Sequence, residues 1–340
     1  MIHLSNDVLN ELRGSTPLII FHWDVDGIAS TALLTKYLEL SPILYTPMIG
    51  FYKLDIQEIL DFKGYDSIFI VDFGVETGAI ESLKLEIDDE VYVFDHHLRR
   101  ESEKINIFPY RDPDGDIYPS ESIMVTDLLG IETNILTALG FVGDLFGKAL
   151  ENKYSYILRE KWNIYGFGYG DIKVFVDLIQ SNYVFMDKDE IISSVYKLIE
   201  ALEDPYIILE NSLWRKRYQV MYESINKVLS LDIESRDGLR FIELEDKLYI
   251  TSYVGRYLAD KYRGDYILIG VPELLGGYSQ IYLRISGKSG KNFLELIEEL
   301  NELGVYAGGK ENVVGVFMDR DRYNEVLNYI FSWLGFKDRL

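Results

Sequence analysis

The sequence predicts an α/β protein in which an N-terminal domain with a parallel sheet is joined by a helical connector to a smaller α/β domain. Three observations predict this fold. Short apolar runs alternate with helical patterns in the N-terminal half, and strands that are buried on both faces and separated by helices form parallel sheets. From about residue 120 the pattern becomes helical, and after residue 229 strands return. At about 150 residues per domain, 340 residues correspond to roughly two domains.

The first predicted strand, residues 18–22, lies between Pro17 and an acidic turn at residues 24–27. A helix with apolar periodicity follows at residues 28–40. The same alternation continues along the chain. Further strands are predicted at residues 42–47, 67–72 and 90–95, with helices at residues 55–62 and 76–85.

The same signals define the second half. Helices are predicted at residues 131–150, 191–202 and 206–229, a hairpin at 240–244 and 247–251, helices at 254–262 and 292–303, strands at 266–271, 280–286 and 313–318, and a final helix. The segment 206–229 is long enough to connect two domains. We therefore predict domains at residues 1–205 and 236–340, joined by residues 206–235.

Composition excludes several classes of protein. Without cysteine, no disulfide framework, cysteine zinc site or thiol nucleophile can carry the function. The apolar runs are far shorter than the ~20 residues of a membrane helix, and acidic and polar residues stand where a signal peptide would be apolar. These observations predict a cytoplasmic protein that does not contact membranes.

Charge is distributed unequally along the chain. The 34 basic and 56 acidic residues give a net charge of −22, which argues against a broad electrostatic surface for nucleic acid. Residues 1–210 carry a net charge of −21, and residues 211–340 carry −1. Two explanations of the acid-rich part stay open, namely carboxylates that hold divalent cations and a solubilising surface.

Potential metal ligands follow three of the predicted strands, at the edge where open α/β sheets bind ligands. They are His22, Asp24 and Asp26 after the first strand, Asp72 after the third, and Asp95, His96 and His97 after the fourth. Three of the four histidines of the chain lie in these segments. So many carboxylates at one edge would repel one another unless cations neutralised them. Carboxylate and imidazole ligands together suit Mn²⁺, with Mg²⁺ or another divalent ion as the alternative.

Each residue of this set also has an ordinary explanation. A single strand-terminal Asp such as Asp72 is more often a helix cap or a turn residue. His22 alone would more often be a buried histidine with satisfied hydrogen bonds. The joint occurrence of His-x-Asp-x-Asp-Gly, Asp-Phe-Gly and Asp-His-His, in this order, is what favours a metal centre.

These three motifs resemble those of the DHH phosphoesterase superfamily, which includes RecJ exonucleases, nanoRNases, cyclic-dinucleotide phosphodiesterases and family II pyrophosphatases. The fourth motif of that family, an Asp after a glycine in a helical region, resembles residues 140–144, which end in Asp144. Asp127, in a helical stretch nearby, is the alternative. The resemblance implies a pair of divalent ions, usually manganese, with a bridging water or hydroxide as the nucleophile.

The resemblance also implies a role for each motif residue. The implied metal ligands are His22, Asp24, Asp26, Asp72, His96 and Asp144, with Asp72 as the bridge. His97 would contact the phosphate, and Asp95 would brace a histidine. The basic pair Arg99 and Arg100 either binds phosphate or is simply exposed.

The C-terminal part is similar, more faintly, to the DHHA1 substrate-binding domain. Arg284 and Ser286 stand where that family has an Arg-x-Ser strand, and Gly308, Gly309 and Lys310 stand where it has Gly-Gly-His. The resemblance implies that these five residues bind substrate, with lysine in place of histidine. The alternative is an ordinary Gly-Gly turn before the next strand.

The first motif separates the substrate classes of the superfamily. Family II pyrophosphatases have His-x-x-x-Asp-x-Asp, so the single residue between His22 and Asp24 favours a nucleotide or nucleic acid substrate. The net charge favours short oligonucleotides or a linear dinucleotide over long strands. We therefore expect a manganese-dependent phosphodiesterase or exonuclease that releases mononucleotides from short or single-stranded nucleic acid.

Three questions stay open at this point. The chain could instead be a RecJ-like component of a replication or repair assembly that acts through protein contacts. It could also be a phosphatase for a small phosphorylated metabolite. Tyr278, Tyr282 and Tyr306 could stack on bases or could be ordinary packing residues, because the chain has 26 tyrosines.

Overall fold

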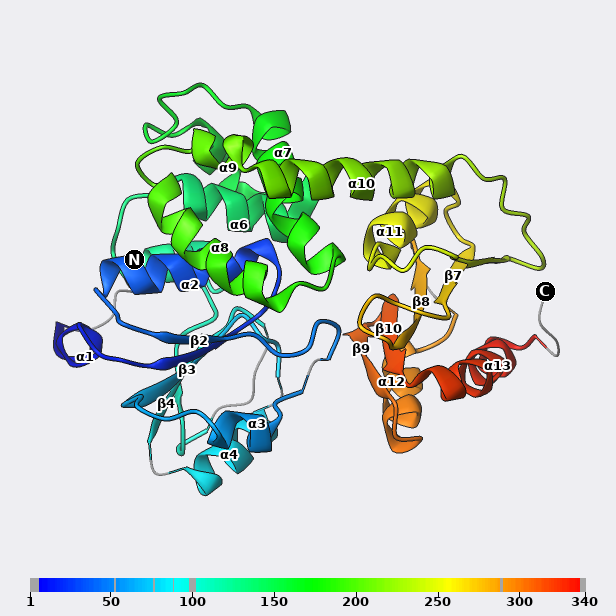
Figure 1. The fold of residues 1–340 in the computed structure, drawn as a ribbon, viewed down its shortest axis with the longest axis horizontal. Helices are drawn as coiled ribbons and strands as arrows, with labels where there is room; N and C mark the ends of the chain where they lie inside the picture. The colour runs from blue at the N-terminus through cyan, green and yellow to red at the C-terminus, as the bar shows by residue number, and fades with distance from the viewer. Residues whose placement is uncertain are drawn as a thin grey trace. The chain divides into compact units, whose positions relative to one another are not determined.

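The computed structural model describes residues 6–51, 53–75, 77–87, 89–97, 102–287 and 290–336. The chain divides into two compact units (Figure 1). The first comprises residues 1–49, 53–183 and 187–216, and the second comprises residues 50–52, 184–186 and 217–340. Two short segments of the N-terminal part therefore belong to the second unit.

A five-stranded parallel sheet lies at the centre of the first unit, as the sequence predicts. Its strands are β1 (Leu18–Phe21), β2 (Ile43–Tyr45), β3 (Ser67–Val71), β4 (Glu90–Phe94) and β5 (Asn106–Ile107), in the order β2-β1-β3-β4-β5. Leu18 pairs with Ile43 on one side and with Ile68 on the other. Every residue of β1 and β3 is buried, which explains their continuous apolar runs. Because all the strands run the same way, their carboxyl ends meet at one edge.

Helices follow the strands and extend the first unit. They are α1 (Asn6–Leu12), α2 (Val25–Tyr37), α3 (Ile56–Leu60), α4 (Thr77–Glu86), α5 (Glu121–Leu128), α6 (Ile135–Leu145), α7 (Tyr169–Val184), α8 (Lys188–Ala201) and α9 (Tyr206–Glu210), with 3₁₀ turns η1 (Phe146–Leu150) and η2 (Lys153–Arg159). Helix α2 is buried from Val25 to Thr35 because it packs against α5, α6 and α8. A helix covered on several sides needs apolar or small residues all round, as α2 has.

The second unit is built on a mixed sheet. Its elements are β6 (Leu239–Glu243), α11 (Thr251–Lys261), β7 (Tyr266–Val271), β8 (Ser279–Ile285), α12 (Phe293–Glu302), β9 (Tyr306–Lys310), β10 (Val313–Met318), η3 (Arg320–Arg322) and α13 (Tyr323–Leu334). The strand order is β6-β7-β8-β10-β9, with β6 and β7 parallel and the other neighbours antiparallel. Leu283 and Val316 belong to a core shared with Phe293 and Leu327 of α12 and α13.

The hairpin predicted at residues 240–251 is wrong. Only its first strand forms, and β6 pairs in parallel with β7 across α11. Residues 247–250 lie outside any strand, and their backbone serves another contact, because Tyr249 N–H donates to Val184 O at 3.0 Å. Residues 245 and 246, between the two predicted strands, therefore belong to the connection of a β-α-β unit.

The connecting segment is two helices rather than one. Helix α9 ends at Glu210, and α10 runs from Ser212 to Leu229. Asn211 between them is extended, and its side-chain oxygen accepts N–H bonds from Leu213 and Trp214, which starts the new helix. Among the described residues, no helix is both long and apolar enough to cross a membrane.

Gly140 gives a test of the packing between α6 and α2. A Cβ atom there would lie 2.3 Å from Asp26 Oδ1 and 2.3 Å from Ser122 Oγ. We expect Gly140→Ala to lower the free energy of unfolding by about 1–3 kcal/mol, as overpacking usually does, in urea titrations. Gly78→Ala in α4 is the matched control, because a Cβ there meets nothing within 4 Å and alanine favours a helix. Equal stability of the two variants would contradict the tight contact.

Candidate metal centre

Residues from three strand ends come together at the carboxyl edge of the first sheet. His22 follows β1, Asp72 follows β3, and residues 95–97 follow β4. His22 N–H donates to Val71 O at 3.1 Å, and Asp72 N–H donates to Phe94 O at 2.8 Å. The hydrogen bonds of the sheet therefore continue past the strands and hold these residues in adjacent positions.

Ligand atoms of His22, Asp24 and Asp72 lie within 4.8 Å of one another. Asp24 is the N-cap of α2, where Oδ1 accepts the N–H of Gly27 at 3.1 Å and Oδ2 lies 3.0 Å from Nδ1 of His22. A Cβ on Gly27 would lie 2.4 Å from the His22 carbonyl oxygen, so the close turn requires glycine. Asp72 has a φ of +53°, a left-handed conformation that costs energy and is often found at functional sites.

A second group with the same spacing consists of Asp26, His96 and Asp144. Asp26 lies in the first turn of α2 and Asp144 lies in α6. The carboxylate of Asp26 accepts N–H bonds from Glu121 at 2.6 Å and from Ser122 at 2.9 Å, which are the first residues of α5. Three helices therefore take part in positioning this group.

Asp72, His96 and His97 form the third group. His96 is buried, and its Nδ1 lies 3.0 Å from the carbonyl oxygen of Tyr118, to which it donates. In the neutral ring this leaves Nε2 with the lone pair that a metal requires. Nε2 lies 3.4 Å from Asp72 Oδ1 and 3.9 Å from Asp144 Oδ2.

Asp95 orients His97. It is fully buried, and its Oδ1 accepts both the backbone N–H of His97 at 2.9 Å and the ring Nδ1–H at 2.8 Å. Its Oδ2 accepts the N–H of Gly74 at 2.7 Å, so one carboxylate joins the loops after β3 and β4. The side chain of His97 is 36% exposed, against 8% for His96 and 4% for Asp72. His97 is thus more open to a ligand from solvent than His96.

Burial and mutual repulsion perturb the acids of this edge. Burial raises the pKa of Asp26 to about 7, and Asp144 and Asp24 add to the rise. Burial, followed by repulsion from Asp26, raises the pKa of Asp72 well above its usual value. For His96, burial opposes the charged ring, but Asp72 and Asp144 outweigh it and raise its pKa well above the usual value. The edge holds more negative charge than its histidines balance.

The donor set fits divalent cations. Asp72 and His96 each belong to two of the three groups, so the groups form one continuous set of carboxylates and imidazoles. Within the described ranges, no lysine or arginine pairs with Asp26, Asp72 or Asp144. Carboxylate and imidazole ligands suit Mn²⁺ and related ions.

Sequence reasoning missed Glu121. It is the first residue of α5 and is fully buried, and neither of its carboxylate oxygens has a hydrogen-bond partner among the described residues. Burial raises the pKa of Glu121 well above its usual value, with Asp72 and Asp95 adding to the rise. The sequence signal for Glu121 was its position directly after the N-cap Ser120. An acidic residue at the start of a helix is ordinarily explained by its favourable interaction with the helix dipole.

Other acids that could be confused with ligands are engaged elsewhere. Asp127, the alternative to Asp144, accepts the hydroxyl of Tyr118 at 2.5 Å and belongs to none of the three groups. Lys153 Nζ lies 2.6, 3.4 and 2.7 Å from the carboxylates of Asp112, Asp114 and Asp116, so these three acids are already engaged by one ammonium group.

The residues predicted to bind substrate lie in the second unit. Arg284 is in β8, Ser286 follows it, and Gly308, Gly309 and Lys310 are in β9. The alternative of a Gly-Gly turn is wrong, because both glycines pair with β10. Gly309 has a φ of +154°, and a Cβ there would meet the backbone oxygen of residue 313 at 2.0 Å, so packing alone requires glycine at this position. Arg99 and Arg100 lie outside the described residues.

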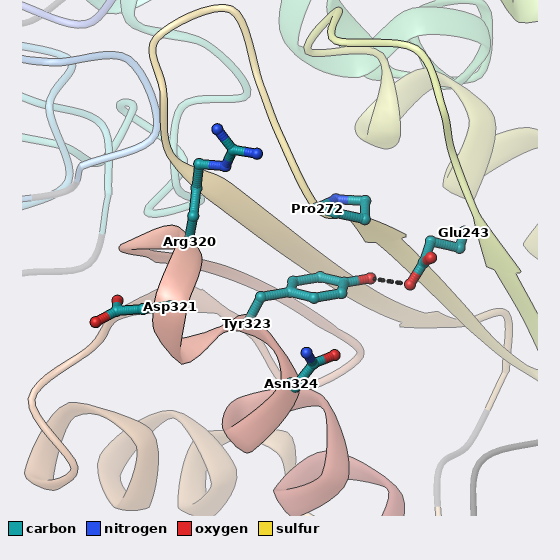
Figure 2. A pocket seen from close by; sticks show the side chains of 6 residues that line it. All are labelled: Glu243, Pro272, Arg320, Asp321, Tyr323 and Asn324. Atoms are coloured by element: carbon teal, nitrogen blue, oxygen red, sulfur yellow. Dashed lines mark hydrogen bonds between the residues drawn. The ribbon is translucent and has the colours of Figure 1, made fainter.

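The second unit has a hollow of about 610 Å³, and Figure 2 shows the side chains that line it. It is lined by Glu243, Pro272, Arg320, Asp321, Tyr323 and Asn324. The hydroxyl of Tyr323 donates to Glu243 at 2.8 Å, and Arg320 pairs with Glu273 at 2.9 Å. None of the residues predicted from the motifs lines this hollow.

The fold and this donor set are similar to those of the DHH family. Residues 17–146 match the model of the DHH family, N-terminal domain. The match includes all the motif residues from His22 to Asp144, so the resemblance drawn from the motifs is confirmed. No curated protein matches the chain.

Solved structures extend the likeness to the second unit. RecJ from Thermus thermophilus in complex with Mn²⁺ has a TM-score of 0.66 and 17% identity over 96% of this chain. The match covers 53% of that RecJ, so this chain spans about half its length. An exonuclease RecJ bound to manganese has a TM-score of 0.65 and 17% identity, with 96% of this chain and 92% of that chain covered. CDC45 from Entamoeba histolytica has a TM-score of 0.54 and 12% identity, with 96% and 98% covered. These likenesses confirm the predicted two-part α/β architecture.

Variants of Asp144 and Asp127 can be compared to test which of the two residues is a metal ligand. We expect Mn²⁺ to raise the melting temperature of the wild type and of Asp127→Ala, because Asp127 belongs to none of the ligand groups. Asp144→Ala should lose most of this rise and bind Mn²⁺ at least about tenfold more weakly in calorimetric titration, a typical loss at perturbed metal sites. The assignment fails if Asp127→Ala loses the metal effect and Asp144→Ala keeps it.

The raised pKa values predict how pH acts on the metal-free protein. Asp26 holds its proton up to about pH 7 when folded, whereas its usual pKa is 3.8. Its stabilising contribution is therefore complete below about pH 4 and is lost as pH rises through 7. Asp72 and His96 shift in the same direction. In EDTA, we expect the free energy of unfolding from urea titrations to fall between about pH 5 and 8.

Mn²⁺ should reverse this trend, because it competes with the same protons and binds more tightly as pH rises. Asp26→Asn, which cannot titrate, should show a shallower fall in EDTA than the wild type. A stability that is flat or rises over this pH range without metal would contradict the assignment of the raised pKa values.

Proposed function

We propose that the protein is a divalent-metal-dependent phosphodiesterase that releases mononucleotides from short or single-stranded nucleic acid. The observation that carries the proposal is the continuous set of three ligand groups sharing Asp72 and His96 at the carboxyl edge of a DHH-type sheet. All the residues of the motifs are present and adjacent, which supports catalysis over a purely scaffolding role.

His22, Asp24, Asp26, Asp72, His96 and Asp144 would hold the cations. When bound, a pair of divalent ions would act as Lewis acids toward a phosphoryl oxygen and lower the pKa of a coordinated water. Manganese is the ion we favour, because carboxylate and imidazole ligands together suit it and RecJ structures of this fold are named with it. Magnesium, named with another RecJ structure, is the alternative.

His97 would contact the phosphate of the substrate. Its ring is partly exposed, and its Nδ1–H is already committed to Asp95, so Nε2 is left for the ligand. Asp95 keeps that ring in place through two further backbone bonds.

The second unit would bind the rest of the substrate, with residues 236–340 as the substrate-binding domain. Arg284 and Lys310 supply positive charge, and Gly308 permits close approach of a backbone to a phosphate. Ser286 donates to Asp260 at 3.2 Å, so its hydroxyl is available as an acceptor. The net charge of −22 supports short substrates, because long strands are normally held by many cationic contacts.

The test is incubation of the purified protein and Mn²⁺ with end-labelled substrates. A 5-mer RNA, a 5-mer DNA, a 40-mer single strand and a linear dinucleotide separate substrate length from sugar type. We expect release of mononucleotides, fastest from the short substrates, and loss of at least about a hundredfold in rate for Asp72→Ala, which removes a residue common to two ligand groups.

Asp127→Ala serves as the control, since that residue lies outside the ligand groups and should retain activity. If metal binds but nothing is released from any substrate, the nuclease proposal is wrong. Release of phosphate from small esters alone would identify a phosphatase instead.

A further inference from the structure

One face of the second sheet carries an aromatic residue and two cations in register. On β9, alternate positions 306, 308 and 310 place Tyr306, Gly308 and Lys310 on the same face. Lys310 and Arg284 are both paired with Val313 of β10, so the two cations lie in one row across the strands.

The opposite face of these strands is apolar. Ala307 of β9 is paired with Val316 of β10; Val316 belongs to the core of the unit, and Ala307 is partly buried against that core. The side that carries Tyr306 and Lys310 is therefore the side turned away from that core.

The structure separates the three tyrosines that could stack on a base. Tyr282 is 6% exposed and packs on Gly255 of α11, where a Cβ would lie 2.3 Å from its ring. Tyr278 is half-buried against Phe51. Tyr306 is 40% exposed. Of the three, Tyr306 is the one that offers a substantial part of its ring to a ligand.

The ring of Tyr306 is held in place by other aromatic rings. Its centroid lies 4.2 Å from that of Phe51, which in turn lies 5.0 Å from Tyr278 and 5.7 Å from Phe317. Phe317 is buried, so this cluster is anchored in the unit. A stacking residue that is already ordered loses little freedom on binding, which favours affinity.

The far end of the same face is suited to phosphate. Within the described residues, neither Arg284 nor Lys310 has a carboxylate partner, and Arg284 donates to the hydroxyl of Tyr282 at 3.0 Å. Between the aromatic and cationic rows, a Cβ on Gly315 would find no atom nearer than the Gly308 oxygen at 4.0 Å, so the strip is open. The four strand steps from position 306 to position 310 span about 13 Å.

We propose that this face binds two successive nucleotides, with a base stacked on Tyr306 and a phosphate of the neighbouring nucleotide held by Arg284 and Lys310. The inference rests on the proposed function and specifies its substrate as an oligonucleotide of at least two residues. The backbone positions of Tyr306 and Lys310 lie farther apart than the base of a mononucleotide lies from its own phosphate, which favours the phosphate of a neighbouring nucleotide. The stacked base also distinguishes this substrate from small phosphate esters, which have no ring to place on Tyr306.

The experiment measures binding apart from hydrolysis. Full-length Asp72→Ala protein is titrated with a fluorescent 5-mer, followed by anisotropy, in the backgrounds Tyr306→Leu, Tyr306→Phe and Tyr222→Leu. Tyr222 is the control because it is 54% exposed and lies on α10, outside this sheet. We expect Tyr306→Leu to bind about fivefold to a hundredfold more weakly, the usual effect of losing one stacked base. Tyr306→Phe and Tyr222→Leu should bind like the parent.

A second measurement uses the ligand as the variable. The same 5-mer with single abasic positions should bind more weakly to the parent at one or two positions, and Tyr306→Leu should abolish that difference. If Tyr306→Leu binds as Tyr222→Leu does, or if no 5-mer binds, the inference is overturned. Hydrolysis of the 5-mer by the wild type is measured separately. If the wild type cleaves the 5-mer but Tyr306→Leu does not weaken binding, this inference is wrong and the proposed function still stands.

Discussion

Carboxylates repel one another most strongly where water cannot screen them, and the carboxyl edge of the first sheet gathers several in such a place. Asp26, Asp72 and Glu121 are all buried, and each has a pKa above its usual value. Folding such a group costs free energy unless protons or cations compensate it. The surrounding structure is arranged around this requirement.

Several features of the first unit support the acidic edge. The amino end of α5 points two backbone N–H groups at Asp26, and a partial positive charge at a helix N-terminus favours a carboxylate there. Asp24 is held by the start of α2 in the same manner. Gly140 gives Asp26 the room to accept both bonds, so packing and electrostatics act on the same residue. The extensive burial of α2 then fixes both aspartates relative to the sheet.

The features of the fold that depend on local sequence pattern could be predicted from the sequence. Buried strands, the helices between them and the order of the motifs all follow from alternation and from residues at strand ends, as with His22 and Asp72. Contacts between distant segments could not be predicted in this way. The hairpin prediction was wrong because β6 pairs with β7, which follows α11 in the chain. The choice between Asp144 and Asp127 depended on where the ligand atoms converge. Glu121 became a candidate only when its burial was known, and exposure singled out Tyr306 from the three tyrosines that could stack on bases.

The short segments that the earlier part of the chain contributes to the second unit have a consequence for any fragment of the protein. Phe51 supports Tyr306, and the carbonyl of Val184 accepts the N–H of Tyr249. A fragment beginning at residue 217 would carry the whole second sheet and lack both contacts. Its aromatic cluster would lose a central ring, and Tyr306 would regain rotamer freedom. The second unit is therefore not a domain that can be cut out at residue 217, because residues 50–52 and 184–186, which complete it, come from earlier parts of the chain.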